Sequence, residues 1–403
     1  MTDFFTKAAK MEVAGALHEA LALYQKALLL APESAVILNN IGNCYRKQNQ
    51  FRLAQENLIK AIAFDPNLPD AHNNLGLVLN QQGRFQQAKS ETEAALNLAP
   101  NTISYMNNLA NILVSLGHLE DARRCYTDIL KIAPDTVEAH IGHAKVHKFA
   151  QGDTYFTALI NQAKRPELTS QQKHHILFAL GKAQEDLGNF DIAFKVFQAA
   201  NDIFKKNYAF NSVHQTHKIQ EVIECYPAPH QISELDHQPL TPVFVLGVSR
   251  SGKSLVERLL DQSTVTYSLD EDMSLFHVLK KMFVSQKIQS QFPLGAPQLT
   301  GENYRDLADQ YSAELWEMSC GASHFIHTAP AFYKLVGLIF QTFPNAKVIY
   351  CLRDPMDIFI ETYFYNYEHG NHYARDLDWI KQHFINYNSM MSHWERQYGD
   401  RIH

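Results

Sequence analysis

The sequence predicts an α solenoid built from helix pairs, followed by an α/β domain with a mainly parallel sheet. Two observations predict it: proline recurs at a fixed interval through the first half, and a short apolar strand runs into a glycine-rich loop and a helix start in the second half. We expect the solenoid at 1–206, a connection at 207–240 and the α/β domain at 241–403. The connection should be partly helical around His217–Cys225.

Composition narrows the classes of function. The chain is 46% hydrophobic and 19% charged, with a net charge of −6, so it can bury a core and lacks the basic field of a nucleic-acid binder. It has no apolar run long enough for a membrane span, and the N-terminus lacks a signal-peptide pattern. Five scattered cysteines favour neither disulfides nor zinc (Cys44, Cys125, Cys225, Cys320, Cys351). We therefore expect a cytoplasmic protein.

The repeat is read from four prolines that lie 34 residues apart, at Pro32, Pro66, Pro100 and Pro134. A proline ends a helix because its ring clashes with the preceding turn, and small residues earlier in each unit let two helices approach closely. The pattern resembles the tetratricopeptide (TPR) repeat, whose helix pairs must stack to bury their apolar stripes. A fifth unit starts near Val137 and degrades at Gly152; a sixth unit is clear from Leu180 to Ala200.

Paired asparagines recur on the expected first helix of three units, again 34 residues apart. The second member of each pair is Asn40, Asn74 and Asn108. An amide donates and accepts hydrogen bonds, so such a ladder can bind the backbone of an extended peptide. The alternative is that these asparagines only face water. TPR arrays mostly bind protein segments, so the resemblance implies a polypeptide partner in either case.

The second half opens with a phosphate-binding motif. Residues 242–246 read as a buried strand, and Gly247–Ser254 matches G-x-x-x-x-G-K-[ST] immediately before a helix start. Glycines allow backbone N–H groups to approach anionic oxygens, and the helix N-terminus adds its positive dipole end. Lys253 is expected to reach a terminal phosphoryl or sulfuryl group, and Ser254 to bind a phosphate or hold Mg²⁺.

Three blocks of residues then resemble one family. Arg250-Ser-Gly, with Leu255-Val-Glu257 behind it, is similar to the loop of TPR-containing bacterial sulfotransferases and their protein-tyrosine sulfotransferase relatives. The block 337–355, which ends in Arg353-Asp-Pro, and the block from His372 to Trp394 also resemble that family.

The resemblance implies transfer of a sulfuryl group from PAPS (3′-phosphoadenosine 5′-phosphosulfate) to a hydroxyl, without a metal. Tyrosine in a peptide bound by the TPR groove is one candidate acceptor. It implies that the loop holds the 5′-phosphate, that Arg250 neutralises the transferring group and that Arg353 binds the 3′-phosphate. Glu271 falls where related enzymes place the general base. The implied donor-binding residues are Gly247, Arg250, Ser251, Gly252, Lys253, Ser254 and Arg353; the implied catalytic residues are Glu271, Arg250 and Lys253.

The chain departs from that family at three positions. Lys253 replaces a loop threonine, Thr328 stands where the family often has a lysine, and Glu361 replaces a serine that contacts the 3′-phosphate. Lys253 or Lys334 is expected to supply the missing cation. The family usually continues beyond the equivalent of His403, so we expect that this chain lacks the last part of the domain.

Other interpretations stay open. Arg353 can instead pair with Asp354 or Asp357, and the run Asp270-Glu271-Asp272 can be a solvated face or helix cap. We expect a structural role for His369 and His372, because no third metal ligand accompanies them, and a core position for four aromatic residues (Tyr363, Tyr365, Tyr367, Trp394). Two other functions compete with sulfuryl transfer: an inactive scaffold that binds protein or nucleotide, and an ATP- or GTP-dependent P-loop enzyme. An ATP- or GTP-dependent P-loop enzyme needs an apolar strand that ends in an aspartate. The sequence has no clear strand of this kind, because the best candidate is followed by Arg353 before Asp354.

Overall fold

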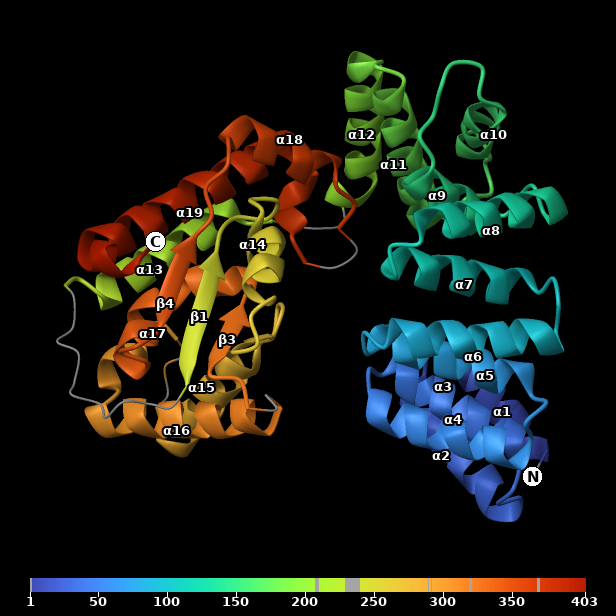
Figure 1. Ribbon diagram of the computed structural model, residues 1–403, viewed down its shortest axis with the longest axis horizontal. Coiled ribbons are helices and arrows are strands. Elements are labelled where there is room, and N and C mark those ends of the chain that lie inside the picture. Colours follow the sequence, from blue (N-terminus) through green and yellow to red (C-terminus); the bar gives the residue numbers. More distant parts are fainter. Residues whose placement is uncertain are drawn as a thin grey trace. The chain divides into compact units, whose positions relative to one another are not determined.

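The structure is a computed structural model that describes residues 2–206, 210–228, 240–288, 290, 292–318, 321–367 and 370–403. It divides into two compact units, Met1–Val196 and Phe197–His403. Figure 1 shows the first as stacked helices and the second as helices around a small sheet.

The first unit is the predicted solenoid of antiparallel helix pairs. Its helices are α1 (Thr2–Val13), α2 (Leu17–Leu30), α3 (Ala35–Lys47), α4 (Phe51–Phe64), α5 (Pro69–Gln81), α6 (Phe85–Leu98), α7 (Ile103–Ser115), α8 (Leu119–Ile132), α9 (Val137–Val146), α10 (Thr154–Ala163), α11 (Ser170–Asp186) and the start of α12 (Phe190–Lys205). Helices α2, α4, α6 and α8 each end two residues before a repeated proline, as the residue before proline disfavours helix. The degraded fifth unit forms two short helices, α9 and α10.

Small residues allow the helices of a pair to approach closely. A Cβ added to Gly42 in α3 would lie 2.6 Å from Leu58 Cγ in α4, and one added to Gly76 in α5 would lie 2.4 Å from Thr92 Oγ1 in α6. Ala54 and Ala88 on the second helices are fully buried. The small residues that recur in the sequence therefore lie where the two helices of a pair are in contact.

The second unit contains a four-stranded parallel sheet with the order β2–β3–β1–β4, which confirms the predicted fold class. The strands are β1 (Thr241–Leu246), β2 (Thr266–Ser268), β3 (His324–His327) and β4 (Lys347–Tyr350). The helices are α13 (Ser212–Cys225), α14 (Lys253–Leu260), α15 (Ser274–Ser285), α16 (Gly301–Met318), α17 (Val336–Thr342), α18 (Pro355–Phe364) and α19 (Leu377–Tyr398), with four short 3₁₀ turns (Ala296–Gln298, Pro330–Lys334, His372–Arg375, Gly399–Arg401).

Alternation along β1 divides the core of this unit between two faces of the sheet. Phe244 and Leu246 belong to the large cluster that includes residues of α13, α15, α16, α17 and α19. Val243 and Val245 point to the opposite face, where Val256 of α14 packs against them. Successive strand residues point to opposite faces, so the apolar run 243–246 fits a strand that is covered on both sides.

The segment predicted as a connection contributes to this core. In α13, Ile219 and Val222 are buried among the residues of the large cluster. The last part of α12 also belongs to the second unit, because Phe197 stacks on Phe364 at 4.2 Å and Asn201 donates to the carbonyl oxygen of Tyr363. Residues 207–209 and 229–239 lie outside the described residues, as do His369 and Cys320. Among the described helices, none is both long and apolar enough to cross a membrane.

Candidate active site

The carboxyl ends of all four strands lead into one cavity. Because the strands are parallel, β1, β2, β3 and β4 end on the same edge of the sheet, where α/β folds commonly bind ligands. The cavity has a volume of about 520 Å³. The charged and polar side chains that line it include Arg250, Lys253, Ser254, Glu271, Arg353 and Glu361.

The loop after β1 adopts the conformation that its glycines permit. A Cβ on Gly247 would lie 2.2 Å from Ser251 Oγ, so a larger residue at position 247 would clash with the Ser251 side chain. Gly252 has a φ of +97° and forms the N-cap of α14, and Arg250 has a φ of +71°. The amide of Leu255 donates to the Gly252 carbonyl oxygen, whereas those of Lys253 and Ser254, two residues that line the cavity, have no backbone acceptor among the described residues. Free amides at a helix start suit an anion.

The Ser251 side chain is buried inside the loop. The residue is 7% exposed, and its Oγ is fully buried without a hydrogen-bond partner among the described residues. Buried hydroxyl groups are usually paired, because an unpaired one costs desolvation energy. Ser251 lies directly between the lining residues Arg250 and Gly252. This hydroxyl group lies on the inner side of the loop against Gly247 rather than in the cavity lining.

Lys253 is held next to the end of β3. It is 7% exposed, and its Nζ donates to the carbonyl oxygen of Thr328 at 2.8 Å. Burial lowers the pKa of Lys253, and the nearby carboxylate of Glu271 acts in the opposite direction. The chain thus places an ammonium group beside Thr328. Lys334, the other candidate, lies against the ring of Tyr333 instead, at 5.5 Å from its centroid.

The two predicted arginines lie together, joined by one carboxylate. Arg250 Nη2 and Arg353 Nη2 each donate to Glu361, at 3.0 Å to Oε2 and to Oε1 respectively. Arg353 Nη1 also donates to the carbonyl oxygen of Arg250 at 3.1 Å. Burial alone would raise the pKa of Glu361, but the hydrogen bonds from Arg353 and Arg250 lower it below its usual value. Arg353 Nε also lies 3.6 Å from Asp357. Arg353 therefore makes the ion pair that the sequence offered as an alternative, and it lines the cavity as well.

Glu271 lines the cavity from the loop that follows β2, and Glu257 of α14 fixes that loop. Glu257 is 4% exposed and accepts hydrogen bonds from Ser268 Oγ, the Asp270 amide and Thr328 Oγ1. These three partners come from the carboxyl ends of β2 and β3. Glu257 therefore ties both strand ends to the helix behind the loop, a positioning role that its place in the sequence motif did not reveal.

Two tyrosines expected in the core contribute to the cavity instead. Tyr365 is 47% exposed, and its ring lies 4.5 Å from the Arg250 guanidinium carbon. The hydroxyl group of Tyr367 lies 2.8 Å from Ser249 Oγ, and both residues line the cavity. Tyr363 and Trp394 are buried as expected. The difference arises because α18 ends at Phe364, after which the chain turns along the cavity.

The predicted donor-binding residues therefore gather at one site. Arg250, Gly252, Lys253, Ser254 and Arg353 line the cavity together with Glu271. Gly247 and Ser251 lie in the same loop but do not line the cavity. The close contact between these two residues forms the inner side of the loop.

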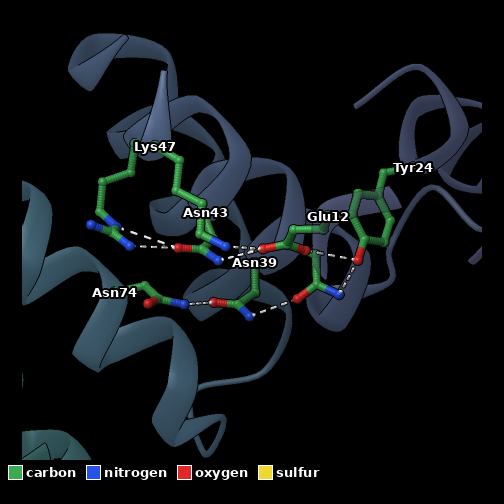
Figure 2. A network of polar contacts seen from close by, with 8 residues as sticks. Glu12, Tyr24, Asn39, Asn43, Lys47 and Asn74 are labelled. Atoms are coloured by element: carbon green, nitrogen blue, oxygen red, sulfur yellow. Dashed lines mark hydrogen bonds and ion pairs between the residues drawn. The ribbon is translucent and has the colours of Figure 1, made fainter. Parts of the chain in front are cut away.

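The asparagine pairs lie on α3, α5 and α7 and connect neighbouring repeats. Asn74 Nδ2 donates to Asn39 Oδ1, and Asn108 Nδ2 donates to Asn73 Oδ1, each at 2.9 Å. Asn40 instead donates to the hydroxyl group of Tyr24 at 3.3 Å. Figure 2 shows this ladder continuing into a cluster of polar contacts around Glu12, Asn43 and Lys47.

Comparisons with known proteins agree with both halves. Residues 242–403 match the sulfotransferase family, residues 42–83 match the TPR repeat and residues 68–135 match the tetratricopeptide repeat. An uncharacterized protein of Aquifex aeolicus (strain VF5) is 25% identical over 275 residues, which cover 66% of this chain and 36% of that protein. The chain thus spans about a third of the length of that relative.

Solved TPR structures align with part of this chain at low TM-scores. Pseudomonas aeruginosa pilF is 16% identical, with a TM-score of 0.42, and the match covers 54% of this chain and 96% of that one. The thermophilic TPR protein TTC0263 of Thermus thermophilus is 18% identical, with a TM-score of 0.39, and the match covers 44% and 98%. The chain thus contains a stretch that matches tetratricopeptide repeats, at residues 42–135, and a domain that matches the sulfotransferase family, at residues 242–403.

Proposed function

We propose that the C-terminal domain transfers a sulfuryl group from PAPS to a hydroxyl acceptor. The observation that carries this proposal is the shared cavity, which is lined by the phosphate-binding loop, by Arg250 and Lys253, and by the carboxylate of Glu271. These are the groups that an in-line transfer needs: an anion cradle, cations near the transferring group and an acceptor for the hydroxyl proton.

In the proposed step, the loop residues from Ser251 to Ser254 hold the 5′-phosphate. The acceptor oxygen attacks the sulfur atom, and the bond between sulfur and the bridging phosphate oxygen breaks. The hydroxyl proton passes to Glu271, and adenosine 3′,5′-bisphosphate (PAP) leaves with the bridging oxygen. Arg250 and Lys253 offset the negative charge that builds up on the transferring and leaving groups. The step requires no metal.

The two ends of the cavity fit this donor unequally. At the loop, the amides of Lys253 and Ser254 and the ammonium group of Lys253 suit a phosphate. At Arg353, to which the 3′-phosphate is assigned, Glu361 already accepts a hydrogen bond. The loop end therefore gives the stronger support to the proposal.

The test is calorimetry on the full chain with PAP, ATP and GTP, with and without Mg²⁺, followed by transfer of labelled sulfate from PAPS to a peptide pool. Metal-independent PAP binding that Lys253→Ala weakens, together with label transfer, is the expected result. ATP binding that needs Mg²⁺ would favour a kinase-like enzyme. Intact PAP binding without transfer would leave a nucleotide-binding scaffold.

We further propose that the repeats bind the polypeptide that carries the acceptor, through Asn40, Asn74 and Asn108. An amide has two N–H donors, so the bond from Asn74 to Asn39 leaves one for a peptide carbonyl. Replacing all three by alanine should weaken binding to an arrayed peptide set at least about tenfold. The exposed loop residue Asn67, changed to alanine, is the matched control. Equal binding by both variants would contradict this role.

A further inference from the structure

The end of the cavity that contains the two arginines already holds a negative charge. Glu361 accepts hydrogen bonds from both guanidinium groups, one on each carboxylate oxygen. This is the arrangement that a bound phosphate would make with two arginines. The side chains of Arg250 and Glu361 are each 38% exposed, so a ligand in the cavity can reach them.

Local structure fixes Glu361 in this position. Asp354, the residue after Arg353, caps α18 by accepting from the amides of Met356 and Asp357, and the helix begins at Pro355. Residues four apart share a helix face, which directs both Asp357 and Glu361 toward Arg353. Glu361 is therefore held by a helix, and its carboxylate lies within the cavity lining.

The charges of the lining divide unequally between the two ends. Arg250, Arg353 and Lys253 are cationic, and Glu271 and Glu361 are anionic. Lys253 donates to an uncharged carbonyl group, and no ion pair with a carboxylate holds its ammonium group among the described residues, so an anion at the loop can approach it. A second anion next to the arginines would first have to displace Glu361 and would then be repelled by it.

We propose that Glu361 determines the donor specificity of this cavity by occupying the place of a second phosphate. The inference rests on the proposed function only in that the cavity binds a nucleotide. The 5′-phosphate end of such a ligand binds at the loop, and a 3′-phosphate adds little affinity while Glu361 is present. Removing the carboxylate frees the Arg250 guanidinium group and the Nη2 group of Arg353, so that a 3′-phosphate adds affinity.

The experiment compares 5′-AMP with PAP by calorimetry on the full chain. For the natural chain we expect the two dissociation constants to agree within about threefold, and for Glu361→Gln we expect PAP to bind at least about tenfold more tightly than 5′-AMP. Glu361→Ser, with a shorter side chain, should act in the same direction. Thermal unfolding of each variant checks that it folds.

Asp357→Asn is the matched control. It also removes one carboxylate charge, 3.6 Å from Arg353, but Asp357 does not line the cavity. It should leave the ratio of the two dissociation constants within about threefold of the natural value. A natural chain that already binds PAP more than tenfold better than 5′-AMP, with no change in Glu361→Gln, would overturn the inference. Failure of both nucleotides to bind the natural chain and both Glu361 variants would contradict the proposed nucleotide site and, with it, this inference.

Discussion

Lys253 and Thr328 are 75 residues apart in the chain, yet the Lys253 ammonium nitrogen lies 2.8 Å from the Thr328 carbonyl oxygen. This bond joins the first residue of α14 to the carboxyl end of β3. It places a buried positive charge beside the loop, and this charge hydrogen-bonds to a neutral carbonyl group while the carboxylates of Glu271 and Glu257 lie near it.

Lys253→Met should separate ligand binding from stability. We expect binding of 5′-AMP to weaken at least about tenfold, since a hydrogen bond from a charged group is lost. Because burial lowers the pKa of Lys253, the unfolded chain keeps this proton to higher pH than the folded chain. Stability should therefore rise with pH through that window in the natural chain but not in the variant.

Calorimetry and urea unfolding at neutral and alkaline pH measure both effects. At neutral pH, the free energy of unfolding of Lys253→Met should stay within about 1 kcal/mol of the natural value. Retained binding with a large loss of stability would show that Lys253 is a structural residue.

Glu271→Gln should lower the rate of sulfuryl transfer by about 10²–10⁴-fold while leaving 5′-AMP binding within about threefold. The amide cannot accept the hydroxyl proton, but it keeps the size of the side chain. Asp270→Asn is the control, because Asp270 has a φ of +54°, which asparagine tolerates, and does not line the cavity. Equal rates in both variants would exclude Glu271 as the base.

Glu257→Ala should destabilise the second unit by about 2–3 kcal/mol, because three hydrogen-bond donors from two strand ends lose their buried acceptor. Glu257→Gln retains an acceptor oxygen and should cost less. All three tryptophans belong to the second unit, so their fluorescence in urea follows this unit alone. Equal losses in the two variants would indicate that side-chain volume, not hydrogen bonding, is what matters.

His327 should make the second unit sensitive to acid. It is fully buried and stacked on Phe244 at 4.8 Å, and burial lowers its pKa to about 3. Below about pH 6.5 the unfolded chain binds a proton that the folded chain does not, so stability falls as pH is lowered toward 3, by about 1.4 kcal/mol per pH unit.

The variant His327→Phe should lose that part of the pH dependence. Between pH 6.5 and 4.5, its free energy of unfolding should fall by about 2.5 kcal/mol less than that of the natural chain, as measured by tryptophan fluorescence in urea. His324→Phe, at the half-buried start of the same strand, should keep the natural dependence. Parallel curves for all three proteins would contradict the assignment.

The sequence alone determined the features that depend on short-range patterns. A proline every 34 residues and small residues at fixed positions specify helix pairs, because these constraints act within one repeat. A strand, a glycine loop and a helix start within 20 residues likewise specify the loop at Gly247–Ser254 where we propose that an anion binds. The resemblance to sulfotransferases also depended on such contiguous blocks.

Only the tertiary structure decided which distant groups meet. Sheet order brings β3 and β4 to either side of β1, and this order sets Thr328 beside Lys253 and Arg353 beside Arg250. The pairing of Glu361 with both arginines depends on the direction of α18, which no local pattern encodes. Side-chain contacts across a sheet edge follow from strand order and helix orientation, and these are settled by burying the whole core.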